Sequence, residues 1–327
     1  MHPEYLSGKL GHRMAEQAAP AYALVQVQHH HAHVAACLAE NGVALDAPAV
    51  IGVALDGLGY GDNGQWWGGE FFRASYRTNT RLATFKPVAM PGAQQAMFEP
   101  WRNTYAHLMA EMGWPRFAMN YAALALFRRL DAKPRALLDS MLLGRVNSPL
   151  ASSCGRLFDA AAAACGVCFE RAAYEGQAAI EFEALADART LEQEGDQLAY
   201  PFGIGRLRGS NLPYIEPLAM WQALLGDLIL DTPVGVVSAR FHKGLAIAIT
   251  RMVDKLSRHE SPDGPIRTVA LSGGVFQNKL LLEQVVARLE HAGFTPLLHR
   301  LVPASDGGVS LGQAVVAAAR ALEQKNR

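Results

Sequence analysis

The chain has 327 residues, a formal net charge of zero and a composition in which half of the residues are hydrophobic. These values are typical of a globular protein large enough for about two domains or lobes. No apolar run is long enough to span a membrane, and no basic excess points to an extended nucleic-acid surface. The four cysteines are too scattered for a disulfide framework and no signal peptide is visible, so we expect a cytoplasmic protein without membrane or nucleic-acid partners.

Four histidines gather at residues 29–33, where a segment of alternating character at 23–28 leads into helix-forming residues. The pattern predicts a helix from His29 to Asn41–Gly42. His29 and His33 then lie four residues apart on one face, a spacing with which two imidazoles bind a divalent metal. A solvated or capping cluster is the alternative, and a tag remnant is disfavoured because the run continues into an amphipathic helix. His30 and His31 are weaker ligand candidates.

A buried strand is predicted directly before Asp56, and a stretch that contains Gly57, Gly59 and Gly61 follows it. An acid at a strand tip before glycines is typical of a metal or phosphate site, because glycine lets backbone N–H groups approach an anion. Asn63–Gly64 is also a strong hairpin signal, and a hairpin whose turn holds phosphate satisfies both interpretations. Two further strands, at 66–76 and 82–88, complete a meander like that of the first lobe of actin-like ATPases.

Residues 113–230 show little strand pattern and predict a largely helical region. Asp159 and Gly176 lie at the starts of two helices within this region. Helix N-termini and flanking acids can hold a nucleotide, although plain helix caps explain the same residues. Further helices are predicted at 101–112, 119–130 and 134–143.

The C-terminal part alternates helices and strands in a doubly wound pattern. Loops at Ser272–Gly273–Gly274 and at Asp306 follow strand ends, which is where such sheets bind ligands. The first loop is a phosphate-cradle candidate, although it is neither a Walker loop nor the GxGxxG fingerprint. The predicted elements are helices at 234–256, 279–291 and 309–324, and strands at 267–271 and 294–301.

Asp56 and Asp306 both occupy strand tips where an interlobe cleft is expected. With His29 and His33 they form a set of two histidines and two carboxylates, which suits iron or zinc with room left for a substrate. His242, inside a predicted helix, is more often a satisfied helix histidine than a ligand.

At this point the chain resembles a known family, the HypF carbamoyltransferases of NiFe-hydrogenase maturation. The likeness covers nearly the whole chain, and several of its motifs are long and specific. The motifs lie at residues 2–7, 28–33, 55–61, 67–70, 99–102, 152–159, 174–176, 241–242 and 272–278.

The resemblance implies the carbamoyl-transfer domain of that family, an α/β protein with the two-lobed actin-like (ASKHA) fold. It implies a first lobe at 1–105 and a second at 106–327, the latter divided into a helical part at 106–230 and a doubly wound part at 231–327. Asp306 and His33 are the catalytic candidates. The implied metal ligands are His29, His33, Asp56 and Asp306, and the implied contacts for ATP or carbamoyl-adenylate are Gly57, Gly59, Gly61, Asp159, Gly176, Gly273, Gly274 and Asn278, with magnesium as a further possible ion.

The same resemblance implies that carbamoyl-adenylate, made from carbamoyl phosphate and ATP, carbamoylates the C-terminal cysteine of a hydrogenase-maturation partner. This step supplies the precursor of the cyanide ligands of the NiFe site. A small-molecule O-carbamoyltransferase, a tRNA threonylcarbamoyl transferase and a nucleotide-binding scaffold for a maturation partner are the alternatives. The acylphosphatase, zinc-finger and adenylate-forming domains of longer members are not visible, and residues 91–94 read Pro-Gly-Ala-Gln where the family has Pro-Gly-Gly-Asp.

Overall fold

The computed structural model describes residues 5–17, 24–258 and 264–325. Residues 2–4 of the first resembling motif, and Ala23 at the start of the first predicted strand, lie outside these ranges. The rest of that predicted strand is wrong, because residues 24–28 belong to no strand or helix of the structure. Within the described ranges, no helix has the length and apolar character that crossing a bilayer requires.

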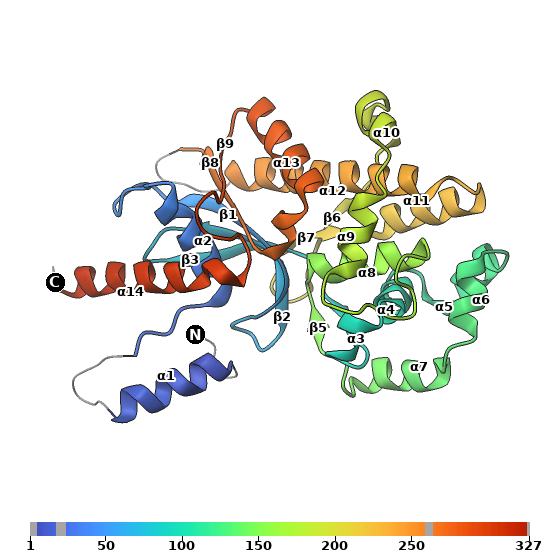
Figure 1. Ribbon diagram of the computed structural model, residues 1–327, viewed down its shortest axis with the longest axis horizontal. Helices are drawn as coiled ribbons and strands as arrows, with labels where there is room; N and C mark the ends of the chain where they lie inside the picture. Colours follow the sequence, from blue (N-terminus) through green and yellow to red (C-terminus); the bar gives the residue numbers. More distant parts are fainter. Residues whose placement is uncertain (1–4, 18–23, 259–263, 326–327) are drawn as a thin grey trace.

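The chain folds into a mixed α/β structure (Figure 1). The strands are β1 (Val50–Tyr60), β2 (Trp66–Ala74), β3 (Asn79–Phe85), β4 (Val88–Ala89), β5 (Leu150–Ala151), β6 (Gly203–Arg206), β7 (Pro213–Glu216), β8 (Thr268–Ser272) and β9 (Thr295–Leu297). The α-helices are α1 (Leu6–Gln17), α2 (His29–Glu40), α3 (Gln95–Phe98), α4 (Trp101–Glu111), α5 (Gly113–Tyr121), α6 (Ala125–Asp131), α7 (Arg135–Gly144), α8 (Cys154–Ala164), α9 (Gln177–Ala184), α10 (Ala188–Gln193), α11 (Leu218–Ile229), α12 (Val234–Ser257), α13 (Lys279–His291) and α14 (Val309–Lys325). Short 3-10 helices are η1 (Asp196–Leu198), η2 (Gly274–Gln277) and η3 (Asp306–Gly308).

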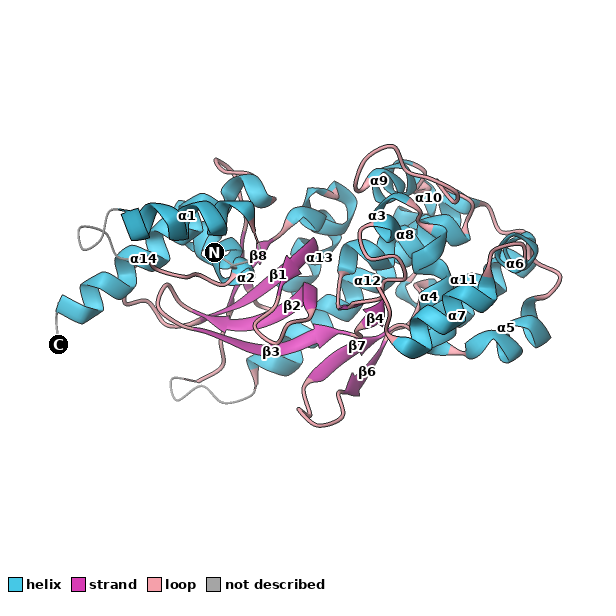
Figure 2. Cartoon of the chain, turned by 90° about the horizontal axis from the view of Figure 1, so that it is seen from below, coloured by secondary structure: helices cyan, strands magenta, loops and turns pink. Residues whose placement is uncertain are grey.

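All of these strands belong to one sheet with β1 near its centre (Figure 2). The order is β6-β7-β3-β2-β1-β8-β9, and β4 and β5 pair beside β2. β1 runs antiparallel to β2 and parallel to β8, so the sheet joins the predicted first lobe to the end of the predicted second lobe. The lobe boundaries at 105 and 230 stay predictions.

The two faces of β1 pack against different layers. Ile51, Val53 and Leu55 belong to the large core that contains α8 and α12, whereas Val50 and Ala54 belong to the core of α2 and α14. Side chains alternate along a strand, so Asp56 continues the face that is covered by α2. This alternation brings the carboxyl group to the histidine helix.

Helix α2 lies between the sheet and α14, and its residues from His29 to Leu38 are all buried. The approach to α14 is so close that a Cβ atom on Gly312 would lie 1.8 Å from the Ala32 carbonyl oxygen. The absence of a side chain at Gly312 therefore allows α14 to press α2 against the sheet.

Most predicted elements are confirmed, including the helix at His29, the helix at 279–291 and the long helix that begins at Val234. The single helix predicted at 119–130 is wrong, because the chain becomes extended at Leu124 and separates α5 from α6. The short β6–β7 hairpin in the predicted helical region was also missed. The predicted strand end at Asp56 is wrong, because β1 continues to Tyr60 through an irregular register between Leu55 and Gly59, whereas the predicted hairpin is confirmed by the antiparallel pairing of β1 with β2.

Candidate functional site

The first turn of α2 carries the histidine pair. The Gln28 side chain accepts a 2.8 Å hydrogen bond from the His31 backbone N–H and starts the helix at His29. His29 and His33 then project from the same face, and their Nε2 atoms lie 3.1 Å apart. The Nδ1 atom of His29 lies 3.5 Å from the Tyr5 hydroxyl, and burial raises the pKa of this tyrosine to about 12.

Two carboxylates from other elements complete the cluster. Asp56 Oδ2 lies 3.1 Å from His29 Nε2 and 3.4 Å from His33 Nε2. Asp306 Oδ1, from η3, lies 3.4 Å and 3.3 Å from the same two nitrogen atoms. The group could therefore hold a metal ion.

The separations fit a tetrahedral ion. Bond lengths of about 2.0–2.1 Å for zinc to histidine nitrogen or carboxylate oxygen correspond to ligand-to-ligand edges of about 3.3 Å. The five separations that join the two imidazole nitrogens to each other and to the two carboxylate oxygens run from 3.1 to 3.4 Å, and all four atoms lie within 4.8 Å of one another. The predicted ligands His29, His33, Asp56 and Asp306 are thus brought together in a suitable geometry.

The two histidines and the two carboxylates shift one another's pKa values through their hydrogen bonds. Burial lowers the pKa of His29, but hydrogen bonds to Asp306 and Asp56 outweigh it and raise the value to about 9. Hydrogen bonds to His29 and His33 hold the pKa of Asp306 well below its ordinary value. Burial raises the pKa of Asp56, yet the same two histidines lower it well below its ordinary value. Without a metal, the cluster thus favours ionised carboxylates beside protonated histidines, whose positive charge a bound cation would replace.

The other candidate histidines have different partners. His31 Nε2 lies 2.7 Å from the Ser75 carbonyl oxygen, on another side of α2. His30 is fully buried, and its Nδ1 atom lies 3.1 Å from Gln28 Nε2. His242 contacts the Ser238 carbonyl oxygen through Nδ1 and Asn278 through Nε2, which matches the expected satisfied helix histidine.

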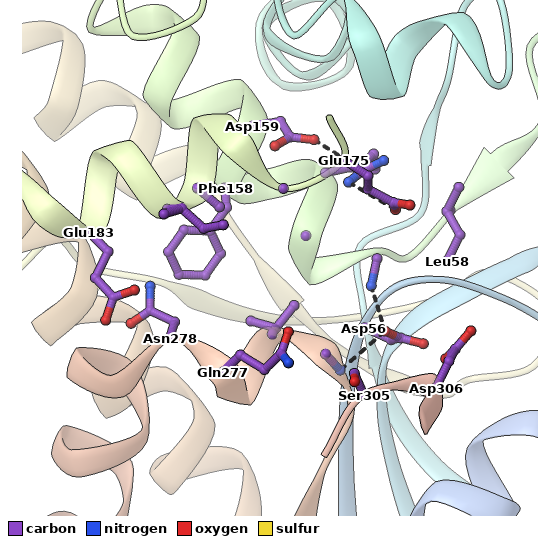
Figure 3. A pocket seen from close by; sticks show the side chains of 18 residues that line it. Asp56, Leu58, Phe158, Asp159, Glu175, Glu183, Gln277, Asn278, Ser305 and Asp306 are labelled. Carbon is purple, nitrogen blue, oxygen red and sulfur yellow. Dashed lines mark hydrogen bonds and ion pairs between the residues drawn. The ribbon is translucent and has the colours of Figure 1, made fainter. Parts of the chain in front are cut away.

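A cavity of about 570 Å³ adjoins the cluster (Figure 3). Asp56 and Asp306 lie at one end, and Glu183 and Asn278 lie at the other, with Phe158 between them. Five of the predicted nucleotide contacts line this cavity: Gly57, Asp159, Gly176, Gly274 and Asn278.

Three predicted nucleotide contacts do not line the cavity. A Cβ atom on Gly59 would lie 2.6 Å from the His29 ring, so this glycine makes room for the imidazoles. Gly61 faces the Trp67 ring, and Gly273, with φ of 100°, faces the Leu55 backbone. Gly59 and Gly61 belong to the β1–β2 hairpin, and the structure does not place them at the cavity.

Arg156 is a functional candidate that the sequence prediction missed. It is the one cationic side chain among the described residues that line the cavity. Its buried guanidinium has Nε 2.9 Å from Asp159 Oδ2 and Nη2 3.6 Å from Glu175. Its Nη1 atom has no hydrogen-bond partner among the described residues, and burial raises the pKa of Asp159 to about 6. Its place within the motif at 152–159 was the available signal.

The loop at 91–94, whose sequence differs from the family pattern, lies outside the cavity lining. Ala93 has φ of 49°, in the left-handed region where glycine is favoured. The pattern Pro-Gly-Gly-Asp implied by the resemblance has glycine at this left-handed position, where the alanine of this chain bears some strain.

Comparison with known proteins supports one family over nearly the whole chain. The family profile for "Carbamoyltransferase, Kae1-like Domain, second subdomain" matches residues 52–313, and that for "HypF Kae1-like domain" matches residues 1–40. The chain belongs to the HypF carbamoyltransferase family. The resemblance inferred from the motifs is therefore confirmed.

Relatives in this family include longer and shorter proteins. Carbamoyltransferase HypF of Rhodobacter capsulatus is 35% identical over 98% of this chain and 39% of its own length. A HypF homolog of Cupriavidus necator is 36% identical over 97% of this chain and 76% of its own length. The chain thus spans about two fifths of the longer HypF proteins.

The fold also matches solved HypF structures. The crystal structure of full-length HypF in the phosphate- and nucleotide-bound form has a TM-score of 0.81 and 32% identity, and covers 99% of this chain and 38% of that one. The T. kodakarensis HypF structure has a TM-score of 0.78 and 28% identity, and covers 98% of this chain and 40% of that one. The chain accordingly has the fold of the Kae1-like part of HypF.

We expect His29→Ala and His33→Ala each to remove most of the bound metal, because each supplies one of four converging ligand atoms. His31→Ala should keep its metal, because that imidazole contacts Ser75 instead. The measurement is metal content by mass spectrometry of dialysed, untagged protein whose folding is checked by circular dichroism. Equal metal content in His33→Ala and wild type would remove these residues from the metal site.

Proposed function

We propose that this HypF-family chain transfers a carbamoyl group from carbamoyl-adenylate to the C-terminal cysteine of a hydrogenase-maturation protein. The observation that carries the proposal is that Asp56 and Asp306 belong both to the four-ligand cluster and to the cavity lining. A group bound in the cavity therefore lies beside the metal position. Iron or zinc held by His29, His33, Asp56 and Asp306 would supply a Lewis acid for the carbamoyl oxygen or for the charge on the leaving phosphate.

The two carboxylates differ in how firmly they are held. Asp56 directs Oδ2 to the histidines, while Oδ1 accepts hydrogen bonds from the backbone N–H groups of Gly57 (2.9 Å) and Gly274 (3.2 Å). Asp306 has a side chain that is 71% exposed and reaches the cluster from a short 3-10 turn. Asp306 and His33 are therefore proposed as the catalytic pair, with Asp306 on the side from which a donor and acceptor approach.

The charge of the cavity favours a donor with a single phosphate. Five carboxyl groups line it, from Asp56, Asp159, Glu175, Glu183 and Asp306, against one cation, Arg156. ATP brings a larger negative charge and requires magnesium beside these carboxylates, whereas carbamoyl-adenylate carries one phosphoryl charge. The acids distant from the metal end can accept hydrogen bonds from ribose hydroxyls, and Phe158 offers an aromatic face to a base.

The proposed reaction needs no protein nucleophile. The acceptor thiolate forms a new S–C bond at the carbamoyl carbon, the bond from that carbon to the phosphate oxygen breaks, and AMP leaves with the electron pair. The chain's own part is to hold the adenylate beside the cluster and to exclude water. The proposed two-lobed actin-like arrangement is supported by a cavity that residues of both predicted lobes line, including Gly57 and Glu175.

The test uses carbamoyl-adenylate as the donor and three acceptors: a maturation-protein peptide that ends in cysteine, a tRNA and an aminoglycoside sugar. A second arm supplies carbamoyl phosphate and ATP, which asks whether this chain also makes the adenylate. We expect carbamoyl transfer to the thiol alone, detected by mass spectrometry. Asp306→Ala should abolish transfer and keep most of the nucleotide affinity, because the residues that line the distant part of the cavity remain.

Transfer to tRNA in place of the thiol would favour a tRNA-modifying transferase, and transfer to the sugar would favour a small-molecule O-carbamoyltransferase. Nucleotide binding without transfer to any acceptor would leave the scaffold role.

We expect Arg156→Met to weaken AMP binding by at least tenfold, about 1.4 kcal/mol, and to leave adenosine binding nearly unchanged. The reason is that the phosphate, and not the nucleoside, needs the cation. Calorimetric titrations of both ligands measure this, with Arg156→Lys as the charge-preserving variant and the exposed Arg206→Met as the control. Equal losses for AMP and adenosine would show that Arg156 shapes the pocket and does not bind phosphate.

A further inference from the structure

A row of buried polar side chains extends from the metal cluster into the protein. His33 Nδ1 lies 3.5 Å from Ser272 Oγ, and Ser272 Oγ lies 2.7 Å from His299 Nε2. His299 Nδ1 in turn lies 3.1 Å from Glu40 Oε1. The side chains of His299 and Glu40 are 5% and 4% exposed, and Ser272 is fully buried.

Glu40 also accepts hydrogen bonds from the segment that leads to Asp306. Its Oε1 accepts a 2.8 Å hydrogen bond from the Arg300 backbone N–H, and its Oε2 accepts 3.0 Å hydrogen bonds from the backbone N–H groups of Leu301 and Val302. Farther along, the Ala304 carbonyl accepts a hydrogen bond from Gly273, directly after Ser272. The last residue of α2 is thereby tied to the loop that carries the fourth ligand.

We propose that Glu40 and His299 are positioning residues of the metal centre. Glu40 sets the place of Asp306 through the backbone of residues 300–302 and orients His33 through His299 and Ser272. The inference rests on the proposed metal site and adds the groups that hold its ligands in place.

Donor and acceptor roles are consistent from His33 through Ser272 to His299, and Glu40 Oε1 faces His299 Nδ1 at an ion-pair distance of 3.1 Å without a hydrogen bond of good geometry. An imidazole that binds metal through Nε2 carries its proton on Nδ1, so His33 donates to Ser272 Oγ. The Ser272 hydroxyl then donates to His299 Nε2, which leaves the proton of His299 on Nδ1, facing Glu40. Burial lowers the pKa of His299, which favours this neutral form.

Ser272, His299 and Glu40 are arranged in the order of a Ser-His-Glu catalytic triad. Sequence patterns did not reveal this arrangement. Ser272 has no exposed surface and is absent from the cavity lining, so a substrate cannot reach its hydroxyl. His33 is the group that Ser272 does reach. The row therefore acts on a metal ligand and not as a nucleophile.

The test measures Co²⁺ binding by the full chain, using titration calorimetry and the visible absorption of the bound ion. Glu40→Gln and Ser272→Ala should each weaken Co²⁺ binding by roughly 10- to 100-fold. Both should also change the absorption spectrum, which a purely structural loss far from the ion does not do. Glu194→Gln, which removes an ion pair to Arg240, is the matched control and should match wild type in both readouts.

Circular dichroism confirms that each variant is folded, and Ser272→Ala, which removes a single hydroxyl, keeps the test decisive if Glu40→Gln unfolds. Folded variants with wild-type affinity and spectrum would overturn the positioning role while leaving the metal centre intact. A wild-type chain that binds no Co²⁺ would instead refute the metal centre itself.

Discussion

Two imidazole nitrogens and two carboxylate oxygens converge from three separate segments of the chain, and the site depends on this convergence. His29 Nε2 and His33 Nε2 lie only 3.1 Å apart, and Asp56 is buried with them. Bringing such groups out of water is costly unless a cation or a proton balances them. A divalent ion at the centre of the four atoms would satisfy them together, and its binding to the folded state would stabilise the fold by mass action.

The packing around α2 makes the convergence possible. The alternation along β1 turns Asp56 to the α2 face, and the lack of side chains at Gly59 and Gly312 lets rings and helices approach closely. Asp56 links the cluster to the cavity. One of its carboxylate oxygens faces the histidines, and the other accepts hydrogen bonds from the backbone N–H groups of Gly57 and Gly274 at the cavity wall. The carboxylate of Asp56 thus belongs both to the candidate metal site and to the wall of the cavity.

Local pattern was sufficient to predict much of this site from the sequence. The spacing of His29 and His33, with two acids beside glycines, was enough to select the four candidate ligands, although Asp56 lies inside β1 and Asp306 in η3, and neither is at the strand end that the sequence predicted. The role of the hairpin glycines was harder to predict. Gly59 leaves space for the imidazole rings, and a glycine that makes room for a side chain gives the same sequence pattern as one that approaches a phosphate. Pairing of residues distant in sequence, such as Ser272 with His299 and His299 with Glu40, leaves no periodic signal. Arg156 was missed because its functional character comes from being the cation among carboxylates in the cavity, which only the folded chain displays.

X-ray absorption spectroscopy of the protein loaded with zinc or iron tests the four-ligand site, because it reports the donor atoms around the ion. We predict a first shell with two histidine nitrogens and two carboxylate oxygens, at about 2.0–2.2 Å for zinc, with imidazole outer-shell scattering that is lost in a variant lacking His29 and His33. A shell containing sulfur, or one made only of oxygen atoms without imidazole scattering, would contradict it.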